Sequence, residues 1–272
     1  MARYTVIGAS GFVGARLTTT LMAEGREVWA PPRDEPRLFT DDLGLVFYCA
    51  GLTADYLARP FDTVEAHVSL IARLLQKGRF ERLVYLSSTR LYDWAGPEAG
   101  REDEPLSLRP AEPRHLYDLS KALGENLCLT QSGGRASVAR LACVWDWTDG
   151  SPGFLSEWMQ KARSSRELSF DSATGYVRDY IHLDDTVAAL RAILDSGAAG
   201  IFNVASGENV SNGEMAEVFE AAGWHVRLAR ETPRQAAPRC DVARIASLGV
   251  KPALVRDVVA AALKGEDFRA AR

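Results

Sequence analysis

The chain has 272 residues, of which 47% are hydrophobic and 25% charged, and its formal net charge is −4 at pH 7. Such a chain can bury one large core, or a core and a smaller lobe. Acidic and basic residues are mixed along the sequence, so no basic face for nucleic acid is expected. No segment approaches the ~20 apolar residues of a membrane span, and the N-terminal residues lack a signal-peptide pattern. The four cysteines are widely spaced and show no metal-ligand rhythm, which favours a reducing cytoplasm and no metal site.

Short β-rich runs alternate with helical patterns through the first half of the chain. Strands are predicted at Tyr4–Ile7, Glu27–Ala30, Leu45–Cys49, Leu83–Leu86 and Ser137–Leu141. Helices are predicted at Phe12–Ala23, Phe61–Gln76 and His115–Thr130, where apolar residues recur at helical spacing, as in Val64, Val68, Ile71 and Leu75. This alternation predicts the α/β class, with a parallel, doubly wound sheet of the Rossmann type. The connection from Ala30 to Leu45 is short and proline-rich, so it is predicted to be a loop.

A glycine-rich segment follows the first predicted strand and opens the first helix. Its glycines are Gly8, Gly11 and Gly14, in the sequence GASGFVG. Glycine here permits a tight turn and close approach of the backbone to a pyrophosphate, while the helix N-terminus supplies N–H donors. The alternative is a glycine-rich turn without a ligand. The predicted cofactor-binding residues at the carboxyl ends of the first and third strands are Gly8, Ser10, Gly11, Phe12, Val13, Gly14, Ala50 and Gly51.

The second predicted strand is followed by Ala30-Pro31-Pro32-Arg33-Asp34. An NAD-preferring protein usually has an acidic residue here for the ribose hydroxyls, and in this chain that residue is absent or displaced. Arg33 is therefore a candidate for binding a 2′-phosphate, which would favour NADP over NAD. The alternative is an ordinary surface arginine in a loop.

Two residues of the third predicted helix suggest proton transfer. Tyr117 and Lys121 are four residues apart and share one helix face. A neighbouring ammonium group favours the phenolate form of a tyrosine, so Lys121 would adjust the pKa of Tyr117. The alternative is a solvated pair on the helix surface.

The fourth predicted strand ends in hydroxyl residues, within RLVYLSSTRLY. Ligands in open α/β sheets lie beyond the carboxyl ends of the strands. Ser88 is therefore a candidate hydrogen-bond donor to a substrate, and Thr89 a second substrate-binding candidate. The alternative is that these hydroxyls cap the end of the strand.

The pattern loosens after residue 150. Helices are predicted at Leu155–Ala162, Thr186–Leu194 and Gly213–Ala222, and a strand at Ile201–Val204. The chain is thus predicted to have a dinucleotide-binding domain at residues 1–150. Residues 151–272 are predicted to form a smaller substrate lobe whose elements partly return to the first domain. The acidic, proline-rich stretch from Gly96 to Pro113 is predicted to be a loop beside the site.

Together, GASGFVG, LSSTRLY, YDLSK, GYVRDYIH and FNVASG resemble the extended short-chain dehydrogenase/reductase superfamily, in its NAD-dependent epimerase/dehydratase branch. The resemblance spans nearly the whole chain. It implies that Tyr117 is the acid/base, that Lys121 is its partner, and that Ser88 fixes the reacting oxygen. It also implies that Arg178 contacts an anionic group such as a nucleotide diphosphate, with Arg239 as a second candidate. An ion pair from Arg178 to Asp179, Asp184 or Asp185 is the alternative.

The chain departs from the family pattern at three places. His67 and Cys143 stand where relatives often have asparagine, and Thr89-Arg90 replaces the Asp-Glu pair typical of dehydratases. Dehydration is therefore disfavoured, and the leading hypothesis is an epimerase or ketoreductase acting on a nucleotide sugar. Hydride exchange would occur at the nicotinamide C4 of NAD or NADP. The alternatives are a small-molecule carbonyl reductase and a noncatalytic dinucleotide sensor. The resemblance also implies a homodimer, since many family members dimerise through the helix that carries Tyr117 and Lys121 and the helix before it.

Overall fold

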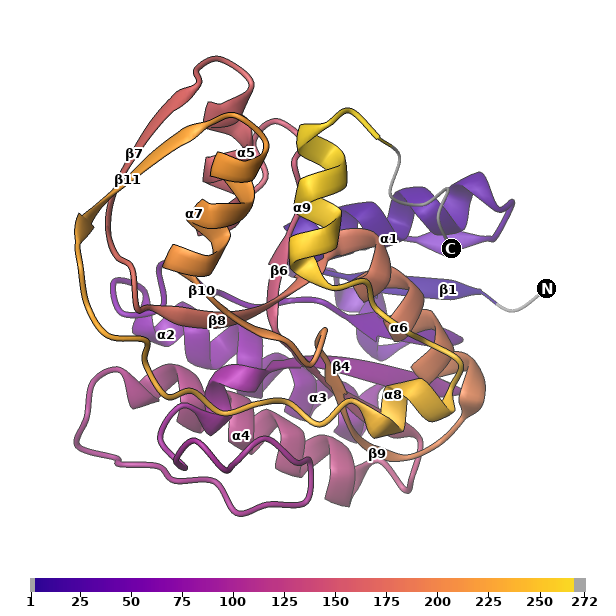
Figure 1. Cartoon of the computed structure of the whole chain (residues 1–272). Helices are drawn as coiled ribbons and strands as arrows, with labels where there is room; N and C mark the ends of the chain where they lie inside the picture. The colour runs from indigo at the N-terminus through magenta and orange to yellow at the C-terminus, as the bar shows by residue number, and fades with distance from the viewer. Residues whose placement is uncertain (1–2, 267–272) are drawn as a thin grey trace.

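The computed structural model describes residues 3–266, and a parallel sheet of six strands forms its centre (Figure 1). The strand order is β2-β1-β3-β4-β5-β9. The strands are β1 (Tyr4–Ile7), β2 (Val28–Trp29), β3 (Leu45–Tyr48), β4 (Arg82–Ser88), β5 (Ala136–Leu141) and β9 (Gly200–Val204). The chain order reverses direction between β1 and β3, which is the kind of position where ligands bind in such sheets. The predicted fold class is confirmed.

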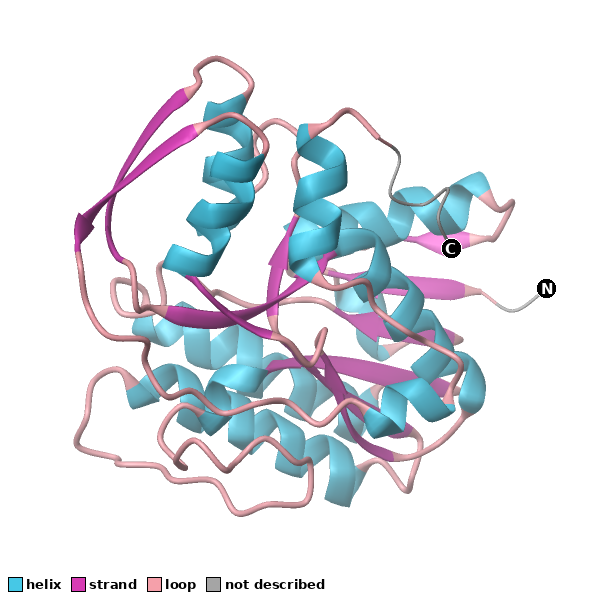
Figure 2. Cartoon of the chain, in the orientation of Figure 1, coloured by secondary structure: helices cyan, strands magenta, loops and turns pink. Residues whose placement is uncertain are grey.

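Helices cover both faces of this sheet (Figure 2). On one face α1 (Phe12–Ala23) packs beside α6 (Leu183–Ser196), and on the other α3 (Leu70–Lys77) packs beside α4 (His115–Gln131). In keeping with helices on both faces, every residue of β1 and every residue of β4 after Arg82 is buried, rather than alternate residues only.

The first half agrees with the sequence-based prediction, apart from the division of one predicted helix. The connection between β2 and β3 has only a short 3₁₀ helix, η1 (Pro36–Phe39), as its proline content predicted. The predicted helix Phe61–Gln76 is divided into α2 (Pro60–Val64), a π-helical turn η2 (Glu65–Ser69) and α3. A single π turn inside an α-helix often marks a functional region.

A second layer of structure lies above the carboxyl ends of the sheet (Figure 1). Its small sheets are β10-β8-β6 and β11-β7, and its aromatic core includes Trp158 stacked on Phe170 with ring centroids 4.4 Å apart. The elements are β6 (Cys143–Trp145), α5 (Phe154–Ala162), β7 (Glu167–Ala173), β8 (Val177–His182), β10 (Asn209–Ser211), α7 (Asn212–Ala221), β11 (His225–Arg230) and α9 (Val255–Leu263). The division at residue 150 stays a prediction.

Two short helices complete the described chain. The 3₁₀ helix η3 (Thr89–Tyr92) follows β4 directly, and α8 (Ala243–Ser247) packs near β9. Between residues 3 and 266, no helix combines the length and apolar character needed to cross a membrane.

Candidate active site

The glycine turn between β1 and α1 leaves no room for side chains. Gly8 has φ +86°, and a Cβ on Gly14 would lie 2.3 Å from the Gly8 carbonyl oxygen. Gly11 is the N-cap of α1 and offers no side-chain cap, so the first-turn N–H groups remain available to a phosphate. These residues fit a dinucleotide diphosphate. Ser10 is exposed beside this turn, and Phe12 and Val13 are partly buried.

The end of β3 meets this turn. A Cβ on Gly8 would be 2.6 Å from the backbone nitrogen of Ala50, and one on Gly51 would be 3.1 Å from Nε2 of His67 and 3.3 Å from Nζ of Lys121. The predicted cofactor residues Ala50 and Gly51 therefore connect the glycine turn with Lys121. Arg33, on the turn after β2, is exposed.

Tyr117, in the first turn of α4, is 3% exposed. Its hydroxyl hydrogen-bonds with the side chains of Ser88 and Thr53. Its ring lies 5.4 Å from the ring of Tyr56. Burial raises the pKa of Tyr117, whereas the hydrogen bond from Ser88 and the positive charge of Arg90 oppose that rise. The phenol is thus held in a dry environment that disfavours its ionised form overall, and Ser88 and Arg90 offset part of this effect.

Lys121 lies one helical turn after Tyr117 and is 5% exposed. Its ammonium group donates a hydrogen bond of 2.8 Å to the backbone oxygen of Leu86 in β4. Burial lowers the pKa of Lys121 to about 8, and the charge of Glu125 partly opposes this. The structure therefore brings Ser88, Tyr117 and Lys121 together at the carboxyl end of β4.

The hydroxyl residues after β4 also serve the backbone. Oγ of Ser88 accepts a hydrogen bond of 3.2 Å from the N–H of Arg90, which caps η3. Oγ1 of Thr89 donates to the carbonyl of Leu141 at 3.3 Å. The capping interpretation of Ser88 is therefore compatible with its contact to Tyr117.

His67 lies in the π turn and is fully buried. Its Nε2 accepts a hydrogen bond from the N–H of Leu52 at 3.2 Å, so Nδ1 carries the proton and donates to Oγ of Ser120 at 2.8 Å. Ser120 donates in turn to the Tyr117 carbonyl at 2.9 Å. Burial and the charge of Lys121 lower the pKa of His67 to about 2, so this histidine is neutral.

Arg178, on β8, has an ionic partner that the sequence did not indicate. Its guanidinium lies 3.8 Å from the carboxylate of Asp93, which also accepts a 2.7 Å bond from Arg114. Two guanidinium groups thus share one carboxylate.

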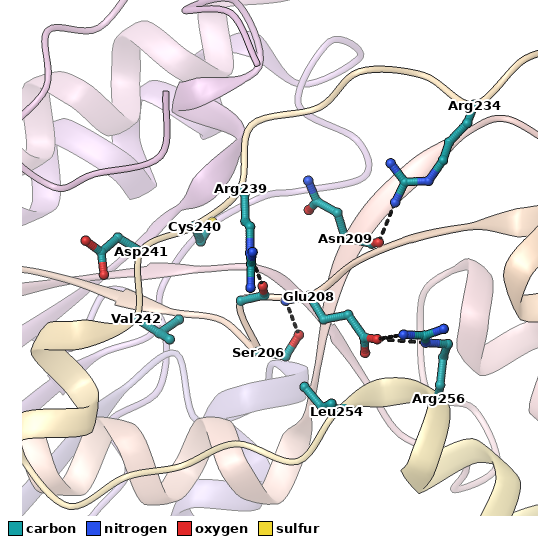
Figure 3. A pocket seen from close by; sticks show the side chains of 11 residues that line it. Ser206, Glu208, Asn209, Arg234, Arg239, Cys240, Asp241, Val242, Leu254 and Arg256 are labelled. Carbon is teal, nitrogen blue, oxygen red and sulfur yellow. Dashed lines mark hydrogen bonds and ion pairs between the residues drawn. The ribbon is translucent and has the colours of Figure 1, made fainter. Parts of the chain in front are cut away.

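Arg239 lies in a different environment (Figure 3). It lines an open pocket of about 790 Å³ with Arg234 and Arg256, and its Nε donates to the Gly207 carbonyl at 2.7 Å. Neither Tyr117 nor Arg178 lines this pocket. A substrate role for Arg239 stays a prediction.

The sequence did not identify three neighbours of Tyr117, namely Arg90, Thr53 and Tyr56. Arg90 was noted only as a departure from dehydratases, although its place two residues after Ser88 could have signalled a site residue. Thr53 and Tyr56 belong to the segment between β3 and α2, where no motif or periodicity marks a residue.

Comparisons with known proteins show the family of the chain. The sequence profile of the NAD dependent epimerase/dehydratase family matches residues 4–205. A dTDP-4-dehydro-6-deoxy-D-allose reductase of Streptomyces bikiniensis is 27% identical, covering 79% of each chain. A GDP-mannose 3,5-epimerase of Oryza sativa subsp. indica is 24% identical, covering 80% of this chain and 68% of the relative.

Solved structures show the same fold. MoeE5 in complex with UDP-glucose and NAD has a TM-score of 0.74 and 22% identity, covering 96% of this chain and 97% of its own. RMD from Pseudomonas aeruginosa complexed with NADPH has a TM-score of 0.70 and 23% identity, covering 97% and 98%. The chain is thus an enzyme of the extended short-chain dehydrogenase/reductase type, and it belongs to the NAD dependent epimerase/dehydratase family.

Proposed function

We propose that the protein is an NAD(P)-dependent epimerase or ketoreductase that acts on a nucleotide sugar. The observation that carries this proposal is the contact between the hydroxyls of Tyr117 and Ser88, with the ammonium of Lys121 one helical turn away. The names of the relatives, which include a dTDP-sugar reductase and a GDP-sugar epimerase, support the substrate class.

In this proposal Ser88 donates a hydrogen bond to the reacting oxygen of the substrate, and Tyr117 takes or returns the proton of that oxygen. The nicotinamide, when bound, accepts or returns the hydride at its C4. Lys121 favours the phenolate of Tyr117 and binds the ribose, because its charge lies beside Gly51, in the segment after β3 that meets the glycine turn. The low exposure of Tyr117 keeps water from the transferred proton.

Arg178 binds the diphosphate of the substrate in this proposal. The support is electrostatic: Arg178 and Arg114 share the single carboxylate of Asp93, so one positive charge remains for an anion. Arg239 remains a second candidate for the same group. Arg33, exposed on the turn after β2, supports a weak preference for NADP.

We further place the enzyme in the cytoplasm as a homodimer. Its four cysteines are free, which suits a reducing compartment. Packed helices α2 and α4 expose Phe61, at 87%, and Leu123, at 48%. Such apolar side chains on adjoining helices suit a helical interface between two copies.

The proposal is tested by denaturing the purified protein and identifying any released nucleotide by absorbance and mass. Titration of the protein with NAD and NADPH follows, and then turnover of UDP-, dTDP- and GDP-hexoses and their 4-keto forms. Retained NAD with sugar inversion indicates an epimerase, and NADPH-dependent reduction of a keto sugar indicates a reductase. Failure to bind either dinucleotide would contradict the proposal.

A further inference from the structure

Arg90 places a guanidinium group beside Tyr117, and within the described part of the chain this group has no ionic partner. Its Cζ lies 4.5 Å from the ring centroid of Tyr117 and 5.2 Å from that of Tyr56. Its Nη2 reaches the Tyr56 hydroxyl at 3.4 Å, which is a weak contact. Among residues 3–266, no carboxylate lies within 4.0 Å of this guanidinium. By contrast, the buried guanidinium of Arg140 is neutralised by Glu125 at 2.6 Å.

One buried acidic side chain acts on this charge but, within residues 3–266, forms no ion pair with it. Asp118 lies next to Tyr117 in α4 and is fully buried, yet its carboxyl oxygens accept no hydrogen bond from any described residue. Burial raises the pKa of Asp118, and the charges of Arg90 and Arg114 oppose that rise. A guanidinium has five N–H donors. The aromatic rings beside Arg90 make cation–π contacts with it but offer no anionic acceptor for these donors. Arg90 therefore keeps donors for an anion from outside the protein.

The position of Arg90 relates it to the reacting groups. Its backbone N–H donates to Oγ of Ser88, the hydroxyl that contacts Tyr117. The side chain of Arg90 therefore begins close to the reacting groups. Burial raises the pKa of Cys143 to about 11, and the charges of Arg178 and Arg90 both oppose that rise. The positive charges of both arginines thus reach Cys143, the first residue of β6, and Arg178 approaches it from β8 in the upper layer.

We propose that Arg90 binds a carboxylate of the substrate, carried on the ring carbon adjacent to the carbinol that reacts with Tyr117. The substrate class is then a nucleoside diphosphate sugar acid rather than a neutral hexose, and this inference rests on the proposed function. A carboxylate fits because its two oxygens match the planar fork of a guanidinium. In the proposed function Arg178 binds the diphosphate, so the anion bound by Arg90 is a second group of the substrate.

The test compares matched pairs that differ only in this carboxylate. Calorimetry measures binding of UDP-glucose against UDP-glucuronic acid, and of GDP-mannose against GDP-mannuronic acid, to the protein saturated with NAD. The wild type is expected to bind one sugar acid at least about tenfold more tightly than its neutral partner, the effect of one charge-assisted hydrogen bond. Equal binding of the two members of every pair that binds overturns the inference and leaves the proposed function standing.

Variants assign the preference to this residue. Arg90→Gln is expected to reduce the acid-to-hexose affinity ratio to near one, and Arg90→Lys to retain part of it. Arg109→Gln is the matched control, because Arg109 is an exposed arginine that also faces an aromatic ring, 5.6 Å from Trp94. It should keep the wild-type ratio. A ratio that survives in Arg90→Gln overturns the inference, and if Arg90→Gln does not fold, the wild-type comparison and Arg90→Lys decide. Binding of no pair contradicts the proposed function and the inference with it.

Discussion

Lys121 connects the proposed proton chemistry to pH. Its ammonium is buried, hydrogen-bonded to the carbonyl of Leu86, and has a pKa lowered to about 8 by burial. The charged ammonium of Lys121 would donate stronger hydrogen bonds to the ribose hydroxyls than the neutral amine. By proton linkage, dinucleotide affinity is therefore expected to fall as pH rises through about 8.

The measurement is a fluorescence titration of NAD at a series of pH values from about 6 to about 10. Lys121→Met should bind more weakly and should lose the pH dependence in this window. His67 does not titrate there, because its pKa is lowered to about 2. A wild-type affinity that does not change across this range would contradict a charged contact from Lys121.

At the residue scale the sequence predicted which three residues of the candidate site lie together. The spacing of four places Tyr117 and Lys121 on one helix face, and the end of β4 brings Ser88 to them. The contacts of Tyr117 with Thr53 and Tyr56 could not be predicted in this way. They depend on how a segment without regular structure folds over α4, and periodicity carries no information on such segments.

At the scale of one element, the run from α2 to α3 has a buried face that the sequence pattern did not reveal, because half of its residues are polar. The sequence predicted a face of Val64, Val68, Ile71 and Leu75. In the structure Thr63, His67, Ile71 and Leu74 are the buried residues, and Val64 is 37% exposed. Hydrophobic periodicity cannot detect a face that is half polar, because it counts only apolar side chains.

Two hydrogen bonds offset the cost of burying the polar ring of His67. They join this run to the segment after β3 and to α4. His67→Phe keeps an aromatic ring and leaves the N–H of Leu52 and the hydroxyl of Ser120 without these partners. We expect the free energy of unfolding to fall by about 1–3 kcal/mol. Urea denaturation measures this change, and His225→Phe, on an exposed position of β11, is the control. Equal stabilities of the two variants would contradict a structural role for the His67 hydrogen bonds.

At the scale of the whole molecule, Asp179 joins the small sheet to the central one. From β8 its carboxylate accepts hydrogen bonds from the N–H and Oγ of Ser206, at 2.9 and 2.8 Å, and from the N–H of Gly207 at 2.8 Å. Both residues lie in the segment just after β9 of the central sheet, which ends at Val204. Burial raises the pKa of Asp179 to about 6, although these three donors favour the ionised form.

Asp179→Asn is expected to lower the free energy of unfolding at neutral pH by about 1–3 kcal/mol, because the new NH₂ group faces donors instead of accepting from them. Asp171→Asn is the matched control, since Asp171 is 86% exposed and pairs with the exposed Arg230. A surface pair of this kind contributes about 0–1 kcal/mol. Thermal unfolding of both variants checks the difference, and equal losses would exclude this link between the sheets.

The sequence predicted the large sheet well, and in the upper layer it predicted helices α5 and α7 but not the strands. Strands of the large sheet are buried on both faces and give continuous apolar runs such as Leu45–Tyr48. In contrast, β7 and β11 pair across more than fifty residues of chain, and β11 alternates exposed and half-buried positions with arginines among them. Pairing between such distant segments is decided by tertiary contacts rather than by local pattern.

The central claim is that Tyr117 transfers the proton, and one measurement tests it most directly. Turnover of the best nucleotide sugar from the substrate panel is compared between the wild type, Tyr117→Phe and the control Tyr4→Phe, whose ring packs against Phe47 in the core. Tyr117→Phe is expected to bind the dinucleotide as the wild type does and to lose turnover by about 10²–10⁴-fold, while Tyr4→Phe stays active. Turnover of Tyr117→Phe close to that of the wild type would contradict the account.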